Sequence, residues 1–191
     1  SCVCTSKVTN MSLLFKEKRT FNGDISTWDT SNVVNMQKMF QTAASFIGTS
    51  TTSSDVLSYW DTSSVNDMSY MFSFAASFTG QLSNWDTSKV STTKEMFRSA
   101  HSFNGNINAW NVSKVTDMNY MFQDARLFNS PIGSWTTSSV TNMEAMFYMA
   151  SQFNQPIGLW NTSNVTNMKD MFRNANSFNG LIYDWNVSNV T

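Results

Sequence analysis

Apolar residues recur along this chain at a fixed interval, and that interval predicts its architecture. From Trp60 onward a tryptophan falls every 25 residues, and Trp28 precedes Trp60 by 32. A Met-Phe pair repeats at the same intervals. A fixed period of about 20 to 50 residues is typical of a solenoid, in which each repeat is one coil stacked on the next. We expect the tryptophans and the paired phenylalanines to form its core: Trp28, Trp60, Trp85, Trp110, Trp135, Trp160 and Trp185, with Phe40, Phe72, Phe97, Phe122, Phe147 and Phe172.

Within one coil, the apolar spacing predicts a short helix. Met118, Met121, Phe122 and Ala125 are spaced 3, 4 and 7 apart, which is one face of a helix. The residue before this segment is Asn, Asp or Thr in every coil, and all three types favour the N-cap position. Thr92-x-x-Glu95 also has the form of a capping box. We therefore expect a helix of about two to three turns in each coil.

The remainder of each coil predicts a turn, a short strand and a corner. Phe-Asn-Gly at 21–23, 103–105 and 178–180 supplies the turn, because glycine allows positive φ. Ile107-x-x-Trp110 is short and apolar, as a strand would be, and Asn-Val-Ser follows it as a corner. The predicted fold class is an α/β solenoid. It is an LRR-like stack of about seven coils, each with a short strand, a corner and a short helix.

The period divides the chain and marks its irregular places. Residues 1–7 form an N-terminal segment with a Cys-x-Cys motif, and residues 8–191 form a single solenoid that we expect to be cut within a repeat at both ends. A Ser/Thr-rich insert of 7 residues near 47–54 is expected to be a surface loop. Thr93 replaces the first methionine of its coil, so we expect that coil to be weaker by roughly 2 kcal/mol.

Charge and motif content exclude several classes of function. The net charge of −1 gives no basic field for nucleic acid, and no apolar run approaches the roughly 20 residues of a membrane helix. His101 is the sole histidine, and no catalytic triad, carboxylate pair, phosphate loop or metal motif stands out. We expect neither an enzyme nor a cofactor or metal. The corner residues Asp29, Asp61 and Asp86 offer oxygen ligands that would suit calcium, but turn capping is the favoured interpretation.

Two kinds of modification are open on the residues alone. Cys2 and Cys4 are too close to bond each other without strain, so they are either inert thiols or form disulfides with partners outside this segment. Six asparagines lie in Asn-x-Ser/Thr sequons, which would carry sugar if the host glycosylates the protein. These are Asn10, Asn111, Asn161, Asn164, Asn186 and Asn189.

Positions that vary from coil to coil are expected to face outward, where function can differ. Large apolar residues on such a ridge favour contact with another protein, although single exposed apolar residues are also normal. The candidate contact residues are Tyr70, Phe74, Tyr120, Tyr148 and Met149.

One string carries a family resemblance. Trp-Asn-Thr-Ser-Asn-Val-Thr-Asn-Met at 160–168, followed by Met171-Phe172, Ala175 and Phe178-Asn179, resembles the BspA-like leucine-rich-repeat surface proteins. More narrowly, it is similar to a 25-residue mycoplasma surface repeat once described as a domain of unknown function. The resemblance runs from Val8 to Thr191, although leucine is scarce and Met, Phe and Trp take its places. It implies an LRR-like solenoid, secreted or at a cell surface, and no catalytic residues.

Two functional hypotheses follow. The first is an extracellular or cell-surface scaffold that binds other proteins in adhesion. The second is a structural subunit of an extracellular filament, assembled from copies of itself by coil stacking or lateral contacts. Neither hypothesis requires nucleic acid or membrane insertion of this segment.

Overall fold

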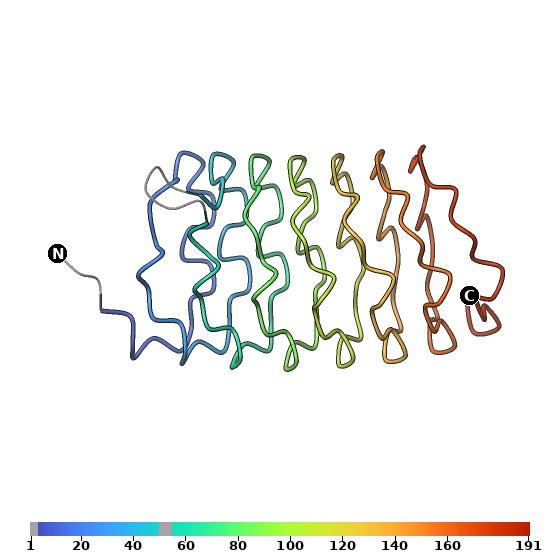
Figure 1. Cartoon of the computed structure of the whole chain (residues 1–191), viewed down its shortest axis with the longest axis horizontal. Helices are drawn as coiled ribbons and strands as arrows, with labels where there is room; N and C mark the ends of the chain where they lie inside the picture. The colour runs from blue at the N-terminus through green and yellow to red at the C-terminus, as the bar shows by residue number, and fades with distance from the viewer. Residues whose placement is uncertain (1–3, 50–54) are drawn as a thin grey trace.

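The chain forms a row of coils stacked along one axis, with its two termini toward opposite ends of the row (Figure 1). The computed structural model describes residues 4–49 and 55–191, and these contain no helix. It follows that they contain no helix long and apolar enough to cross a membrane. Their β-structure consists of isolated parallel bridges between single residues of neighbouring coils.

The bridges set the register of the stack. Each coil pairs with the next through one residue, in the order Asn10, Asn35, Asp67, Thr92, Asp117, Asn142 and Asn167. We number positions within a coil from this bridge residue, which is position 0. Neighbouring bridge residues are 25 apart except for the step from Asn35 to Asp67, which contains the insert. Residues 50–54 of that insert lie outside the described residues.

The predicted α/β solenoid, with a helix and a strand in each coil, is wrong. In the segment expected to be helical, alternate backbone N–H groups form hydrogen bonds with the next coil. Those of Met118, Tyr120 and Phe122 donate to its carbonyl oxygens at 2.8–2.9 Å. The intervening N–H groups, such as that of Met121, donate to the carbonyl three residues back. Helical bonds would run four residues back within one segment. The segment is instead a ladder of β-turns.

Left-handed backbone conformation makes this ladder possible. Positions 3 and 7 have positive φ in every coil, for example 56° at Tyr120 and 54° at Asp124. Each is the third residue of a hydrogen-bonded turn, where type II turns require positive φ. None of these residues is glycine, although a left-handed residue with a Cβ costs about 1–2 kcal/mol. Burial of the intervening side chains offsets this cost.

The spacing misled because the turn ladder has a period of four residues. Positions 1, 4, 5 and 8 are buried, as Met118, Met121, Phe122 and Ala125 show. Over two turns, a period of four places apolar residues almost as a period of 3.6 does. The N-cap prediction failed with it: the Thr92 hydroxyl accepts the N–H of Lys94, two residues on, and no helix follows.

The expected strand at Ile107-x-x-Trp110 is also a turn, closed by a 3.2 Å hydrogen bond from the Trp110 N–H to the Ile107 carbonyl. At the following corner, the Asn111 side-chain oxygen accepts the N–H of Ser113, and Asp86 does the same for Ser88. This hydrogen bond is a turn cap. The neighbouring Thr87 points inward and donates to the Asn111 carbonyl of the next coil.

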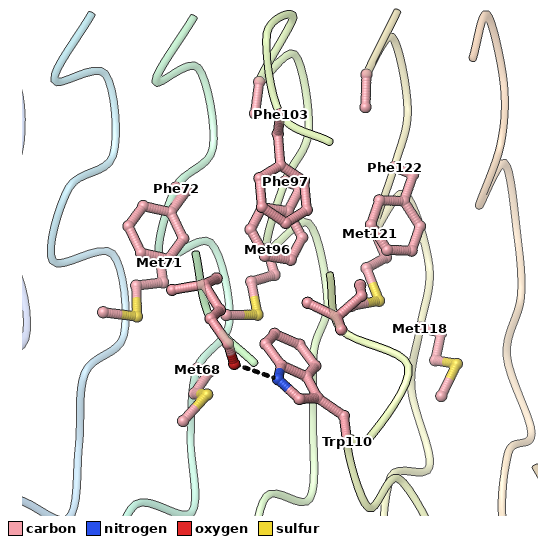
Figure 2. Close-up of a cluster of buried hydrophobic side chains, with 14 of the residues drawn as sticks. Met68, Met71, Phe72, Met96, Phe97, Phe103, Trp110, Met118, Met121 and Phe122 are labelled. Carbon is pink, nitrogen blue, oxygen red and sulfur yellow. Dashed lines mark hydrogen bonds between the residues drawn. The ribbon is translucent and has the colours of Figure 1, made fainter. Parts of the chain in front are cut away.

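The core consists of columns of identical side chains that stack from coil to coil (Figure 2). The rings of Phe97 and Phe122 are 5.6 Å apart, and those of Trp110 and Trp135 are 6.5 Å apart and nearly parallel. Offset stacking at such distances adds to the burial of apolar area. Because no single coil encloses these side chains, the stability of each coil depends on its neighbours.

Each buried tryptophan also ties its coil to the preceding one. The Trp110 indole N–H donates to the Leu82 carbonyl at 3.0 Å, which is the dashed line in Figure 2. The equivalent bond recurs from Trp60 to Trp185. Trp60, Trp85, Trp110, Trp135 and Trp160 are buried, as are Phe40, Phe72, Phe97, Phe122 and Phe147, whereas Trp28, Trp185 and Phe172 are half-buried.

Candidate functional site

The turn ladder presents positions 2, 3, 6 and 7 on its outer side, because positions 1, 4, 5 and 8 point into the core. These outer positions differ from coil to coil. Aromatic and basic side chains gather there in consecutive coils. We call this group the aromatic stripe: Lys38, Tyr70, Phe74, Lys94, Arg98, Tyr120, Tyr148 and Arg173.

Cations of one coil lie over rings of an adjacent coil in this stripe. The Lys38 ammonium is 4.8 Å from the centre of the Tyr70 ring. The Arg98 guanidinium lies between two rings, at 5.3 Å from Phe74 and 5.5 Å from Tyr120. Arg173 lies 5.8 Å from Tyr148. All four distances are within the roughly 6 Å range of cation–π attraction. The stripe therefore holds its aromatic rings in fixed positions.

Hydrogen bonds and ion pairs reinforce the stripe. The Tyr120 hydroxyl donates to the Glu144 carboxylate at 2.7 Å, and this bond, with burial, raises the pKa of Tyr120. Glu144 also accepts a hydrogen bond from the Asn167 side chain at 3.1 Å. Arg98 pairs with Glu95 at 2.8 Å. Tyr120 is thus neutral at physiological pH, and its hydroxyl is bound to Glu144.

A small hollow of about 150 Å³ opens in the stripe at Ala145. Its walls come from three coils: Tyr120 and Gln123, then Ala145 and Tyr148, then Asp170 and Arg173. The side-chain oxygen of Gln123 is buried and accepts no hydrogen bond from the described residues. Asp170 and Arg173 form a loose ion pair at 3.6 Å. The hollow therefore combines two phenol rings with acceptor oxygens.

A second cluster lies beside the stripe. Asp124 accepts from the Arg126 side chain at 2.8 Å and contacts His101 of the preceding coil at 2.9 Å. Burial alone would raise the pKa of Asp124, but the hydrogen bonds from Arg126 and His101 outweigh it and lower that pKa. His101, which sequence reasoning set aside, is thus half of a contact between coils.

The five residues predicted as partner contacts all lie on the outer side of the turn ladder. Phe74 and Met149 are 42% and 37% exposed, and Tyr70, Tyr120 and Tyr148 are half-buried. Sequence reasoning missed the cations that cover these rings. The sequence does contain a signal for these cations, because Lys38, Arg98 and Arg173 occupy positions 3 and 6, as the tyrosines of the stripe do.

The sequons lie at corners and bridges, where their side chains already serve the fold. The side-chain oxygens of Asn10, Asn111, Asn161 and Asn186 accept backbone N–H bonds two residues on. The side-chain nitrogens of Asn164 and Asn189, the atoms that sugar would modify, each donate to a carbonyl of the preceding coil at 2.7 Å. Glycosylation would replace one of the two hydrogens on each of these nitrogens, so the remaining N–H would have to serve that bond.

Of the two cysteines, Cys4 is exposed and forms no disulfide within the described residues, and Cys2 lies outside them. The hydroxyl of Ser6 is 3.5 Å from the Cys4 sulfur. Its hydrogen bonds lower the pKa of this thiol.

Comparison with known protein families gives a match. The model of a family described as "Mycoplasma protein of unknown function, DUF285" matches three overlapping segments, residues 3–53, 48–129 and 105–191. Searches of curated proteins and of solved structures found no significant similarity. Because the three segments together span nearly the whole chain in repeated fashion, this protein belongs to that mycoplasma repeat family of unknown function.

Proposed function

We propose that this chain is a repeat scaffold that binds another protein through its aromatic stripe, at a cell surface or outside the cell. The observation that carries the proposal is the row of rings and cations across consecutive coils, from Lys38 over Tyr70 to Arg173 over Tyr148. Tyrosine and arginine are enriched at the energetic centres of protein interfaces. The resemblance to BspA-like surface proteins supports the same location. The proposal gives the chain a binding role, not a catalytic one.

Pre-ordering of the stripe further supports this role. Long side chains lose about 0.5–1.5 kcal/mol of conformational freedom each when an interface immobilises them. In the stripe, Arg98 is already held by two rings and by Glu95, and Tyr120 by Glu144. A partner therefore meets a largely preformed surface, and less of its contact energy is spent on ordering side chains.

The test places a photo-crosslinking amino acid at Phe74 in one variant and at Tyr59 in another. Tyr59 is 77% exposed and precedes Trp60, outside the stripe, so it is a matched aromatic control. The proposal predicts one protein cross-linked from position 74 and not from position 59. An excess of wild-type chain without the photo-crosslinking amino acid should abolish this cross-link by competition, and an excess of the Tyr120→Ser variant should not.

The outcomes separate the two functional hypotheses. A cross-link from position 74 to a second copy of this chain would favour the filament subunit with lateral contacts. Equal cross-linking from both positions, or competition by Tyr120→Ser as strong as by wild type, would contradict binding through the stripe.

A further inference from the structure

The hollow at Ala145 exists because position 3 carries a small residue in this coil alone. In the other coils from Asn35 onward this position holds Lys38, Tyr70, Glu95, Tyr120 and Asp170. Each of these residues has the same left-handed backbone as Ala145. The missing side chain leaves a gap between Tyr120 on one side and Asp170 on the other, with Gln123 and Tyr148 alongside.

The walls of this gap suit a positive charge. Tyr120 and Tyr148 offer π faces, and Asp170 and the unpaired Gln123 oxygen offer acceptors. Glu144, next to Ala145 in the sequence, does not line the gap, and its carboxylate already accepts hydrogen bonds from Tyr120 and Asn167. Among the lining residues Asp170 and Arg173 balance in charge, so the rings and the acceptor oxygens, and not a net charge, favour a cation here.

In one other coil, position 3 supplies a cation to the stripe. Lys38 occupies position 3 of its coil, and its ammonium lies over the Tyr70 ring of the adjacent coil. At Ala145 the neighbouring ring is Tyr120 of the preceding coil, which has the Arg98 guanidinium 5.5 Å from its centre, and position 3 supplies no cation. The ion pair of Asp170 with Arg173 is long, at 3.6 Å, so this carboxylate retains acceptor capacity.

We propose that the Ala145 hollow receives a basic side chain, lysine or arginine, of the partner protein. This inference rests on the proposed function and names the chemistry of its anchor. The inserted cation lies between the Tyr120 ring and the Asp170 carboxylate and donates to the Gln123 oxygen. The volume of about 150 Å³ is below the 300–1,000 Å³ of ordinary ligand sites. It matches a single side chain at the centre of an interface.

Short peptides test the hollow without knowledge of the partner. The probes are acetyl-Gly-Gly-X-Gly-Gly-amide with X as lysine, arginine, norleucine or glutamate, titrated against the whole chain and followed by NMR of the Gln123 side-chain amide. We expect saturable shifts with the lysine and arginine peptides, at least tenfold tighter than with norleucine, and weaker binding at high salt. Equal binding of the norleucine or glutamate peptide would overturn the proposal.

Variants make the test specific to the hollow. Ala145→Lys mimics Lys38, fills the hollow from within, and should weaken the lysine peptide at least tenfold. Gln152→Lys adds the same charge to an exposed position of the same coil and should not. Asp170→Asn removes an exposed carboxylate and should weaken binding at least threefold, so the proposal stays testable if Ala145→Lys fails to fold. Unchanged binding by Ala145→Lys or by Asp170→Asn would refute it.

The cross-linked partner distinguishes failure of the hollow from failure of the stripe. If Ala145→Lys competes for that partner as well as wild type does, the anchor is wrong and stripe binding stands. If Tyr120→Ser also competes as well as wild type, the proposed function itself fails.

Discussion

Replacement of Thr42 by glycine separates the turn ladder from the helix that the sequence predicts. Thr42 has φ of 63°, which is a costly conformation for a β-branched residue. Left-handed geometry costs a residue with a Cβ about 1–2 kcal/mol, and glycine avoids that cost. Against this, glycine loses about 0.5–1 kcal/mol more in chain entropy on folding. We expect Thr42→Gly to stabilise the protein by about 0.5–1 kcal/mol.

Gln41 provides the matched control, because it adjoins Thr42, is similarly half-buried and has no positive φ. Gln41→Gly gains nothing from relief of strain and should destabilise by about 0.5–1 kcal/mol. The backbone hydrogen bond from residue 42 to the Ser73 carbonyl, 2.8 Å long, does not need the threonine side chain. The two variants should therefore differ by about 1–2 kcal/mol in free energy of unfolding.

Urea unfolding followed by tryptophan fluorescence measures both variants. For a chain of this length, each kcal/mol corresponds to a shift in Tm of about 2–4 °C. In a helix both glycines would destabilise, by a few tenths of a kcal/mol to about 1 kcal/mol. Equal losses in the two variants would therefore refute the turn ladder.

Four further outcomes test the packing. Trp110→Ala should cost about 3–5 kcal/mol in urea unfolding, because it empties a core column and removes the bond to the preceding coil; an unchanged curve would place the tryptophans outside the core. Thr93→Val should stabilise by about 1–2 kcal/mol, because the buried Thr93 hydroxyl has no hydrogen-bond partner among the described residues. Gly133→Ala should destabilise by about 1–3 kcal/mol, because its Cβ would meet the Pro156 carbonyl, and an unaltered Tm would argue against that close approach. Because folding lowers the pKa of Asp124, the ionised carboxylate stabilises the fold above its unfolded pKa of about 3.9, and this stabilisation is lost as pH falls through the lower folded pKa. Asp124→Asn should therefore make the free energy of unfolding less dependent on pH below about pH 4, as measured by acid unfolding.

The repeat and its core columns were readable in the sequence, because burial in a stack requires identical residues at identical intervals. The local backbone conformation could not be predicted from the sequence. Left-handed conformation on Tyr120, Lys38 or Thr42 leaves no mark in the sequence, since glycine or asparagine would be the usual sign. A four-residue period also resembles a helical one over so short a segment.

The candidate site, too, could be predicted from the sequence only in part. Tyr70, Phe74 and Tyr120 were found as variable large residues in a regular repeat. Their covering cations and the hollow at Ala145 depend on which residues of adjacent coils lie side by side. The interval of the repeat indicates which residues of adjacent coils correspond, but the outward direction of positions 3 and 6 follows from the turn ladder and not from a helix.

The turn ladder also gives the stack an electrical direction. In each pair of neighbouring coils, three or four N–H groups of the turn ladder point toward the later coil, as from Tyr120 to Glu144 and from Phe122 to Met146. Fewer backbone N–H groups point the opposite way, as from Thr116 to Ser91. Aligned peptide dipoles add, as they do along a helix, although here they add across the chain and along the stack. The positive pole lies toward the C-terminal coils. The C-terminal end of the stack is therefore the end that the peptide dipoles make more attractive to negative charge.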